Sequence, residues 1–307
     1  MIPALVSNQL QSQGLDHRAN RTWHSRAFFM IKKLLTAAAN SLPKSVQLQI
    51  RDRYRRTKSR LLYQSLYKLM KLENTLRSGI TLQVASKGEW WVYNDIFVNG
   101  EYDIPILRSL ETCSPLRPLT VLDLGANVGY FMLRVVDLVR QTRPEQRVDA
   151  TMVEPSPRVF AELETRMRSQ ALPEASFRMV QGLVGMRAGS ASLHESAVHV
   201  KNTIMSGETR DGRNIPFIDV GVLMEQANEI DLLKCDIEGA ELLFLENHGS
   251  LLGKVRNMVI ELHHEMCDTS KCRDILLRNG FRETVLRSTT PFSVSLLTRD
   301  ELYRARV

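Results

Sequence analysis

The segment Val121–Tyr130, which reads VLDLGANVGY, constrains the fold of this chain more than any other feature. A hydrophobic run carries an acid, Asp123, near its end, passes two glycines four residues apart and leads into a pattern typical of an amphipathic helix. Gly125 and Gly129 can adopt backbone conformations that a Cβ atom would block, so a ligand could approach the backbone closely. The pattern predicts a nucleotide-type site, with Asn127 in its loop, at the carboxyl edge of a parallel sheet.

The acid at position 123 distinguishes this motif from the dinucleotide fingerprint. The fingerprint has a glycine there, which leaves room for a pyrophosphate at the helix N-terminus. A carboxylate would repel a pyrophosphate, but it would attract the cationic methionine part of S-adenosylmethionine (SAM). Asp123 therefore favours SAM as the cofactor, although a plain strand-to-helix turn also fits the pattern.

Two further strand ends carry residues that we expect to contact this cofactor. The segment 147–153 is typical of a second strand and ends at Glu154, where an acid meets ribose hydroxyls in doubly wound sheets. An acid beside a helix N-terminus also interacts favourably with the helix dipole, and the two roles are compatible. Gln181 and Gly182 end the third strand, where we expect either a contact with adenine or a plain strand-ending glycine.

The segments 230–241 (IDLLKCDIEGAE) and 257–264 (NMVIELHH) each combine a buried-type strand with polar groups at its end. Methyl transfer from a sulfonium to an alcohol needs a proton acceptor within hydrogen-bond reach. We predict Asp236, Glu238 and His263 as the catalytic residues, and His263 has the side-chain pKa best suited to neutral pH.

A metal site is a second interpretation of the same segments. Asp236, Glu238, Glu261 and His263 could hold a divalent ion, since oxygen-rich ligands favour Mg²⁺ or Ca²⁺. The spacing fixes no ligand geometry, so we assign no metal ligands from the sequence.

The order and spacing of VLDLGANVGYF, EPSP, IDLLKCDIEGAE and VIELHH resemble the FkbM family of SAM-dependent methyltransferases. The resemblance covers Ser86–Val307, and it implies a class I methyltransferase fold and O-methylation of a hydroxyl on a sugar, polyketide or similar metabolite. Cys235 stands where members of the family usually carry an aliphatic residue, and a buried cysteine behaves as a small hydrophobe. The alternatives are a nucleic-acid methyltransferase and a non-catalytic SAM-binding domain.

The alternation of strands and helices along the second half of the chain predicts a doubly wound, mostly parallel sheet with right-handed crossovers. The last two strands are joined by a link that permits only an antiparallel hairpin, which completes a seven-stranded Rossmann-like sheet. We expect core strands at 119–124, 148–153, 176–181, 230–236, 256–262, 281–286 and 292–297, and helices at 128–140, 157–170, 239–247 and 270–279.

Ahead of this core, 80–85 and 90–93 are predicted to form two strands around a turn at 86–89. The aromatic side chains of this region either contact a ring-shaped substrate or pack the hairpin on the core; they are Trp90, Trp91, Tyr93 and Tyr102. Three histidines outside the motifs, His194, His199 and His248, are predicted to lie at the surface.

The positive charge of the chain is concentrated at its N-terminal end. Residues 1–80 hold 15 Lys and Arg against 3 Asp and Glu, whereas residues 81–307 hold 26 against 31. We predict a disordered leader at 1–29, a basic helical extension at 30–79 whose helix ends near Arg77, and a methyltransferase domain at 80–307. A start codon assigned too early would also explain the leader, because Met30 makes an ordinary beginning.

The partners of the basic extension stay open. Its apolar face, formed by Leu62, Leu66, Leu69 and Leu72, is predicted to pack on the core or on a second subunit in a homodimer. Its arginines could also contact an anionic membrane surface peripherally. The simpler interpretation is that these arginines form a solvated face of the helix. Nucleic acid is a disfavoured partner, because the acidic segment 236–239 would repel phosphates.

Two absences bear on the compartment. No apolar run approaches the roughly 18 residues that a transmembrane helix needs. The four cysteines are scattered and lack the spacing of a zinc site, which favours free thiols in a reducing cytoplasm.

Overall fold

The structure is a computed structural model, and it describes residues 72–194, 203–205 and 213–299. The chain divides into two units, Met1–Tyr63 and Gln64–Val307, and every described residue belongs to the second. The predicted leader and most of the predicted basic extension, including Leu62, Leu66 and Leu69, lie outside the described residues. The domain boundaries, the homodimer and the membrane contact therefore stay predictions.

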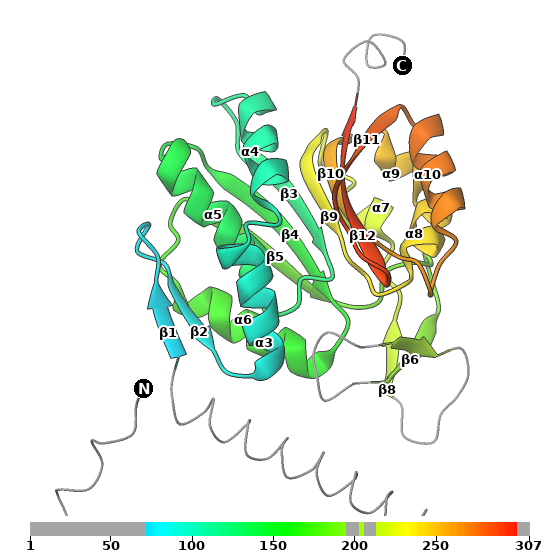
Figure 1. The fold of residues 1–307 in the computed structure, drawn as a ribbon, viewed down its shortest axis with the longest axis horizontal. Coiled ribbons are helices and arrows are strands. Elements are labelled where there is room, and N and C mark those ends of the chain that lie inside the picture. The colour runs from blue at the N-terminus through cyan, green and yellow to red at the C-terminus, as the bar shows by residue number, and fades with distance from the viewer. Residues whose placement is uncertain (1–71, 195–202, 206–212, 300–307) are drawn as a thin grey trace, which may run out of the picture. The chain divides into compact units, whose positions relative to one another are not determined.

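A seven-stranded sheet lies at the centre of the described chain (Figure 1). Its strands are β3 (Leu119–Leu124), β4 (Val148–Glu154), β5 (Ala175–Gln181), β9 (Ile230–Cys235), β10 (Val255–His263), β11 (Phe281–Ser288) and β12 (Phe292–Arg299). They lie in the order β11–β12–β10–β9–β3–β4–β5, and all neighbours are parallel except β12, which runs antiparallel to both β10 and β11. The predicted fold class, including the C-terminal hairpin, is confirmed.

Helices cover both faces of this sheet (Figure 1). One face carries α4 (Asp103–Thr112), α5 (Tyr130–Thr142) and α6 (Pro157–Ser169); the other carries α7 (Val220–Leu223), α8 (Glu241–Asn247), α9 (Gly249–Leu252) and α10 (Thr269–Arg278). Successive strand residues point to opposite faces, so Val121 packs with α5 and Leu122 packs with α8 in two separate hydrophobic clusters. This arrangement buries both faces of the sheet and leaves the strand ends for polar groups.

Two small sheets flank the main one. The strands β6 (Ser190–His194), β7 (Thr203–Met205) and β8 (Arg213–Pro216) form an antiparallel sheet. The strands β1 (Leu72–Thr75) and β2 (Thr81–Val84) form an antiparallel hairpin. The prediction that the basic helix continues to Arg77 is therefore wrong for Leu72–Thr75, because these residues pair with β2.

A second prediction ahead of the core is also wrong: Trp90–Tyr93 is not a strand but part of the helix α3 (Lys87–Tyr93), which continues into a π-helical turn, η1 (Asn94–Val98). The reason is a capping box. Ser86 Oγ accepts a hydrogen bond from Glu89 N at 3.1 Å, and the Glu89 carboxylate accepts one from Ala85 N at 3.2 Å. The spacing Ser86-x-x-Glu89 signals this helix start in the sequence.

The structure shows the burial of one predicted surface histidine and of the aromatic residues ahead of the core. His248 is buried beside Phe244, so its predicted surface position is wrong. Tyr102 is buried and packs edge-on against Phe131, whereas Trp90 and Trp91 keep 40% and 46% of their surface exposed.

Among the described residues, none of the helices is both long and apolar enough to cross a bilayer.

Candidate active site

The loops that follow β3 and β9 meet where the strand order of the sheet reverses, which is where open α/β sheets bind their ligands. Gly125 in the first loop has φ +80°, and a Cβ there would lie 1.8 Å from the backbone oxygen of Asp236 in the second loop. At Gly129, with φ +88°, a Cβ would lie 2.8 Å from Leu163 Cδ1 of α6. Both glycines are therefore required by other segments of the chain, and not only by a ligand as the sequence suggests.

Asp123 is fully buried and faces a lysine that the sequence analysis missed. Lys234 Nζ donates to Asp123 Oδ1 at 3.2 Å and to Gly125 O at 2.8 Å, and it lies 3.7 Å from Asp236 Oδ2. Burial by itself lowers the pKa of Lys234, but the charges of Asp123 and Asp236 raise that pKa above its ordinary value. These charges favour the protonated form of Lys234, and the available signal in the sequence was a lysine inside a mostly apolar strand.

The carboxylate of Asp123 is only partly satisfied by this lysine. Burial raises the pKa of Asp123, and the charge of Lys234 works against that rise. Asp123 Oδ2 is buried and has no hydrogen-bond partner among the described residues. A buried acceptor of this kind suits a cationic or hydrogen-bonding group at the same strand end.

Glu154 ends β4 and joins two loops. Its Oε2 accepts a hydrogen bond from Asn127 N, and its Oε1 accepts one from Ser156 N, both at 2.9 Å. Burial raises the pKa of Glu154 to about 7, against the effect of these two backbone donors. Asn127 has φ +50°, which turns its N–H toward Glu154. Asp123, Gly125, Asn127 and Glu154 therefore come together at neighbouring strand ends.

Gln181 and Gly182 end β5 on the far side of Glu154. Gln181 pairs in register with Glu154 and is exposed, and Gly182 N donates to Glu154 O at 3.2 Å. Neither residue lines the cavity described next. Their contact with adenine stays a prediction.

A cavity of about 140 Å³ lies beside the β3 and β9 loops. Five carboxylates line it together with Lys234: Asp95, Glu101, Asp236, Glu238 and Glu261. Apolar and aromatic side chains complete the wall: Val92, Ile96, Ala126, Val128, Tyr102, Tyr130, Phe131 and Phe292. Cavities that hold whole ligands measure roughly 300–1,000 Å³, so this volume suits the reacting groups rather than a complete cofactor.

Arg287 bridges two acids at the wall of this cavity. Its Nη1 donates to Glu101 Oε2 at 2.7 Å and to Asp95 Oδ1 at 3.3 Å. The contact joins strand β11 to the segment ahead of the core, so two distant parts of the chain close one wall of the cavity.

His263 lies behind the carboxylates and does not itself line the cavity. Its Nδ1 is 2.9 Å from Glu241 Oε1, and its Nε2 is 3.4 Å from Glu261 Oε1 and 3.5 Å from Glu238 Oε2. Burial by itself lowers the pKa of His263, but the hydrogen bond and charge of Glu241, with Asp236 and Glu261, raise it to about 9. The ordinary histidine pKa that favoured His263 as a base therefore does not apply here.

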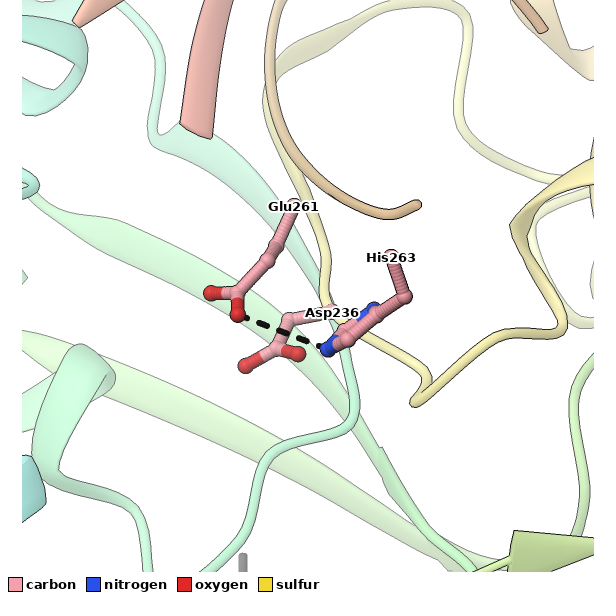
Figure 2. Close-up of side chains that lie close together, drawn as sticks. All are labelled: Asp236, Glu261 and His263. Carbon is pink, nitrogen blue, oxygen red and sulfur yellow. Dashed lines mark ion pairs between the residues drawn. The ribbon is translucent and has the colours of Figure 1, made fainter. Parts of the chain in front are cut away.

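Asp236, Glu238 and Glu261 crowd around the same imidazole. Figure 2 shows the polar groups of Asp236, Glu261 and His263 turned toward one another. Burial and the nearby charge of Asp236 raise the pKa of both Glu238 and Glu261 above the ordinary carboxyl range. Glu238 also has φ +53°, a left-handed conformation that is uncommon for this residue type and is found at functional turns.

Several solved structures resemble this fold at low sequence identity. The methyltransferase FkbM of Methylobacillus flagellatus KT is 16% identical, with 68% of this chain and 60% of that chain covered and a TM-score of 0.40. The precorrin-6y C5,15-methyltransferase of Geobacter metallireducens GS-15 is 10% identical, with 64% and 87% covered and a TM-score of 0.38. Aeropyrum pernix fibrillarin, solved with bound SAM, is 14% identical, with 64% and 74% covered and a TM-score of 0.36.

The family assignment comes from the sequence itself. A comparison with curated proteins found no match. Residues 123–283, more than half of the chain, match the methyltransferase FkbM domain. This match spans the loops after β3, β4 and β9 and the acids around His263. The chain therefore belongs to the FkbM family, and it is a SAM-dependent methyltransferase.

Proposed function

We propose that this enzyme methylates a hydroxyl group of a small molecule or a glycan. The observation that carries the proposal is the cavity lined by Glu101, Asp236, Glu238 and Glu261. A hydroxyl must lose its proton as it attacks a methyl group, and carboxylates at the reacting centre can accept that proton. The aromatic residues of the wall offer flat apolar surface to a ring-shaped acceptor.

Several residues would hold the cofactor. When bound, SAM supplies an electrophilic methyl group on a sulfonium. We propose that Glu154 accepts hydrogen bonds from the ribose hydroxyls, because each of its oxygens keeps acceptor capacity beyond one backbone donor. Asp123, with one unpaired buried oxygen, fits the cationic methionine part. Gly125, Asn127 and Gly129 would form the loop beneath the cofactor, and Gln181 with Gly182 would border its adenine.

Glu238 is the proposed proton acceptor. It lines the cavity, and its left-handed backbone carries its carboxylate on a tight turn after β9. His263 is proposed as a positioning residue, because its Nε2 lies 3.5 Å from Glu238 Oε2 without lining the cavity. Asp236 is proposed to orient the acceptor, with the Lys234 ammonium 3.7 Å from its carboxylate.

The acidic lining also supports a hydroxyl acceptor over a nucleic acid. Phosphates entering beside five carboxylates would be repelled at short range, where charges interact strongly. Most of the basic N-terminal segment lies outside the described residues. We also propose that the enzyme works in a reducing cytoplasm, where its four cysteines, three of them buried, would be free thiols.

The test is a methyl-transfer assay with radiolabelled SAM on separate pools of metabolites, glycans, lipids, tRNA and DNA. We expect label in a hydroxyl-bearing metabolite or glycan, and a loss of roughly 10²–10⁴-fold in turnover for Glu238→Gln, the usual range for a general base. SAM affinity should stay within a few-fold of wild type, because Glu238 is proposed to act on the acceptor. Glu111→Gln, an exposed α4 glutamate paired with Arg108, serves as the control. Label in tRNA or DNA alone would reject the proposal.

A further inference from the structure

We propose that Asp236, Glu261 and His263 form a binding site for a divalent metal ion beside the methyl-transfer cavity. One ligand atom from each residue lies within 4.8 Å of the other two (Figure 2). The role of the ion rests on the proposed function, but its binding does not.

The sheet register brings these three residues together. Glu261 and His263 are two positions apart in β10, so their side chains project from the same face of the sheet. Cys235, the last residue of β9, pairs with Ile260 of β10. Asp236 follows Cys235 and therefore lies level with Glu261, on the face that carries the cavity.

A fully buried carboxylate orients the histidine. Glu241 Oε1 lies 2.9 Å from His263 Nδ1 and also accepts a hydrogen bond from Gly239 N at 2.9 Å. This contact directs the opposite nitrogen, Nε2, toward the carboxylates of the cluster. Metal-binding histidines are typically held in this way, with the second ring nitrogen bonded to a carboxylate that is not itself a ligand.

The spacing of the ligand atoms is compatible with a shared ion. His263 Nε2 lies 3.4 Å from Glu261 Oε1. Two ligand atoms that each lie about 2.1 Å from one ion are roughly 3.0–3.4 Å apart, depending on the coordination geometry. The histidine and one carboxylate thus already stand at ligand spacing, and Asp236 needs only a small side-chain movement to join them.

The charge of the site also calls for a cation. Asp236, Glu238, Glu241 and Glu261 surround His263, and Lys234 divides its single charge between Asp123 and Asp236. Asp236, Glu238 and Glu261 are partly buried, and partly buried carboxylates that outnumber nearby cations repel one another unless protons or a metal ion compensate their charge. Two carboxylates and one imidazole form a mixed donor set that suits Mn²⁺ and also accommodates Zn²⁺. In the proposed reaction the ion would bind the acceptor hydroxyl and lower its pKa.

The experiment measures Mn²⁺ binding by electron paramagnetic resonance and by the rise in melting temperature that bound Mn²⁺ causes, on protein first stripped of metal by a chelator. We expect one Mn²⁺ per chain in wild type. His263→Ala and Glu261→Gln should each weaken binding at least tenfold, and Glu241→Gln, which removes only the orienting charge, should weaken it by roughly 10–100-fold. Glu111→Gln, on an exposed part of α4, should bind as wild type does.

Folding of each variant is checked by its circular dichroism spectrum and its SAM affinity, and the conservative Glu261→Gln keeps the test valid if His263→Ala unfolds. Absence of bound Mn²⁺ up to about 1 mM, or binding that survives both ligand substitutions, would overturn the metal site whatever the acceptor assay shows. Site-dependent Mn²⁺ binding in a chain that methylates no hydroxyl would support the metal site and reject the proposed function, so the two can fail separately.

Discussion

At the scale of single residues, the buried pair of Lys234 and Asp123 joins the neighbouring strands β3 and β9. Lys234 keeps only 6% of its side chain exposed, and Asp123 is fully buried. Removing the lysine leaves an uncompensated carboxylate in the core, which is more costly than losing the attraction itself.

We therefore expect Lys234→Met to lower the free energy of unfolding by about 3–5 kcal/mol, the range for breaking a buried ion pair. Urea unfolding at pH 7 measures this change. Lys271→Met, which removes an exposed lysine from α10, should change the free energy of unfolding by at most about 0.5 kcal/mol. Equal stability of the two variants would show that Asp123 is held by other groups.

Glu154 leads to a prediction about pH. Burial raises its pKa from 4.5 to about 7, so near pH 6 the carboxyl is mostly protonated in the folded protein. Ribose hydroxyls that donate to Glu154 favour its ionised form, so SAM binding below pH 7 must first release a proton. SAM affinity should therefore fall as the pH drops from 8 to 6, by up to about tenfold per pH unit below the pKa.

Calorimetry in two buffers of different ionisation enthalpy would detect the released proton at pH 6. Glu154→Gln should bind SAM more weakly, by roughly 1–3 kcal/mol, and without proton release, because glutamine does not titrate. Proton release that persists in this variant would assign the linkage to another group.

At the scale of structural elements, the loops after β3 and β9 depend on each other through Gly125. Its Cβ position is filled by the backbone oxygen of Asp236, so neither loop can change alone. Gly79 has nearly the same backbone conformation, φ +84° against +80°, but nothing lies within 4 Å of its Cβ position. Alanine substitutions at the two positions therefore distinguish the cost of backbone strain, which both share, from the cost of a steric clash, which only Gly125 has.

We predict that Gly79→Ala costs about 1–2 kcal/mol of stability from the left-handed conformation alone. Gly125→Ala should cost clearly more and should also weaken SAM binding, because the β9 loop must move away. Thermal unfolding and SAM titration of both variants measure the difference. Equal losses of stability would mean that the loop after β9 moves to accommodate the new Cβ atom without a further loss of stability.

The N-terminal cap of α3 allows a prediction about stability. Ser86→Ala removes the side chain that accepts from Glu89 N, and loss of such a cap costs about 1 kcal/mol, within a usual range of roughly 0.5–2 kcal/mol. Ser114→Ala, in the loop between α4 and β3, is the comparison, since Ser114 Oγ accepts only a 3.3 Å contact from Leu116 N in an exposed turn. A smaller loss at Ser86 than at Ser114 in chemical denaturation would contradict the capping box.

At the scale of the whole molecule, the described residues between Leu72 and Leu297 form two hydrophobic clusters that cover the sheet. We therefore predict that a chain beginning at Met30 keeps its melting temperature and its SAM affinity. A loss of 1 kcal/mol would lower the melting temperature of a domain of this size by roughly 2–4 °C. A drop of several degrees would show that residues 1–29 pack against the fold.

The sequence by itself determined the type and order of the core elements and the chemistry of the strand ends. Hydrophobic periodicity and strand-ending acids are local signals, so strands β3, β4, β9 and β10 and the residues Asp123 and Glu154 could be located without a structure. The errors ahead of the core were local too, because the aromatic residues of α3 suggest a strand while the cap at Ser86 specifies a helix.

Only the tertiary structure decided how the polar groups act on one another. Lys234 and Asp123 are 111 positions apart, and His263 and Glu241 are 22 apart, yet these contacts determine which groups are charged. The pKa of a side chain depends on burial and on neighbouring charges, and both are properties of the packed sheet. For this reason His263 is a candidate base in the sequence, but in the fold it lies behind the carboxylates, and Glu241 with its acidic neighbours raises its pKa.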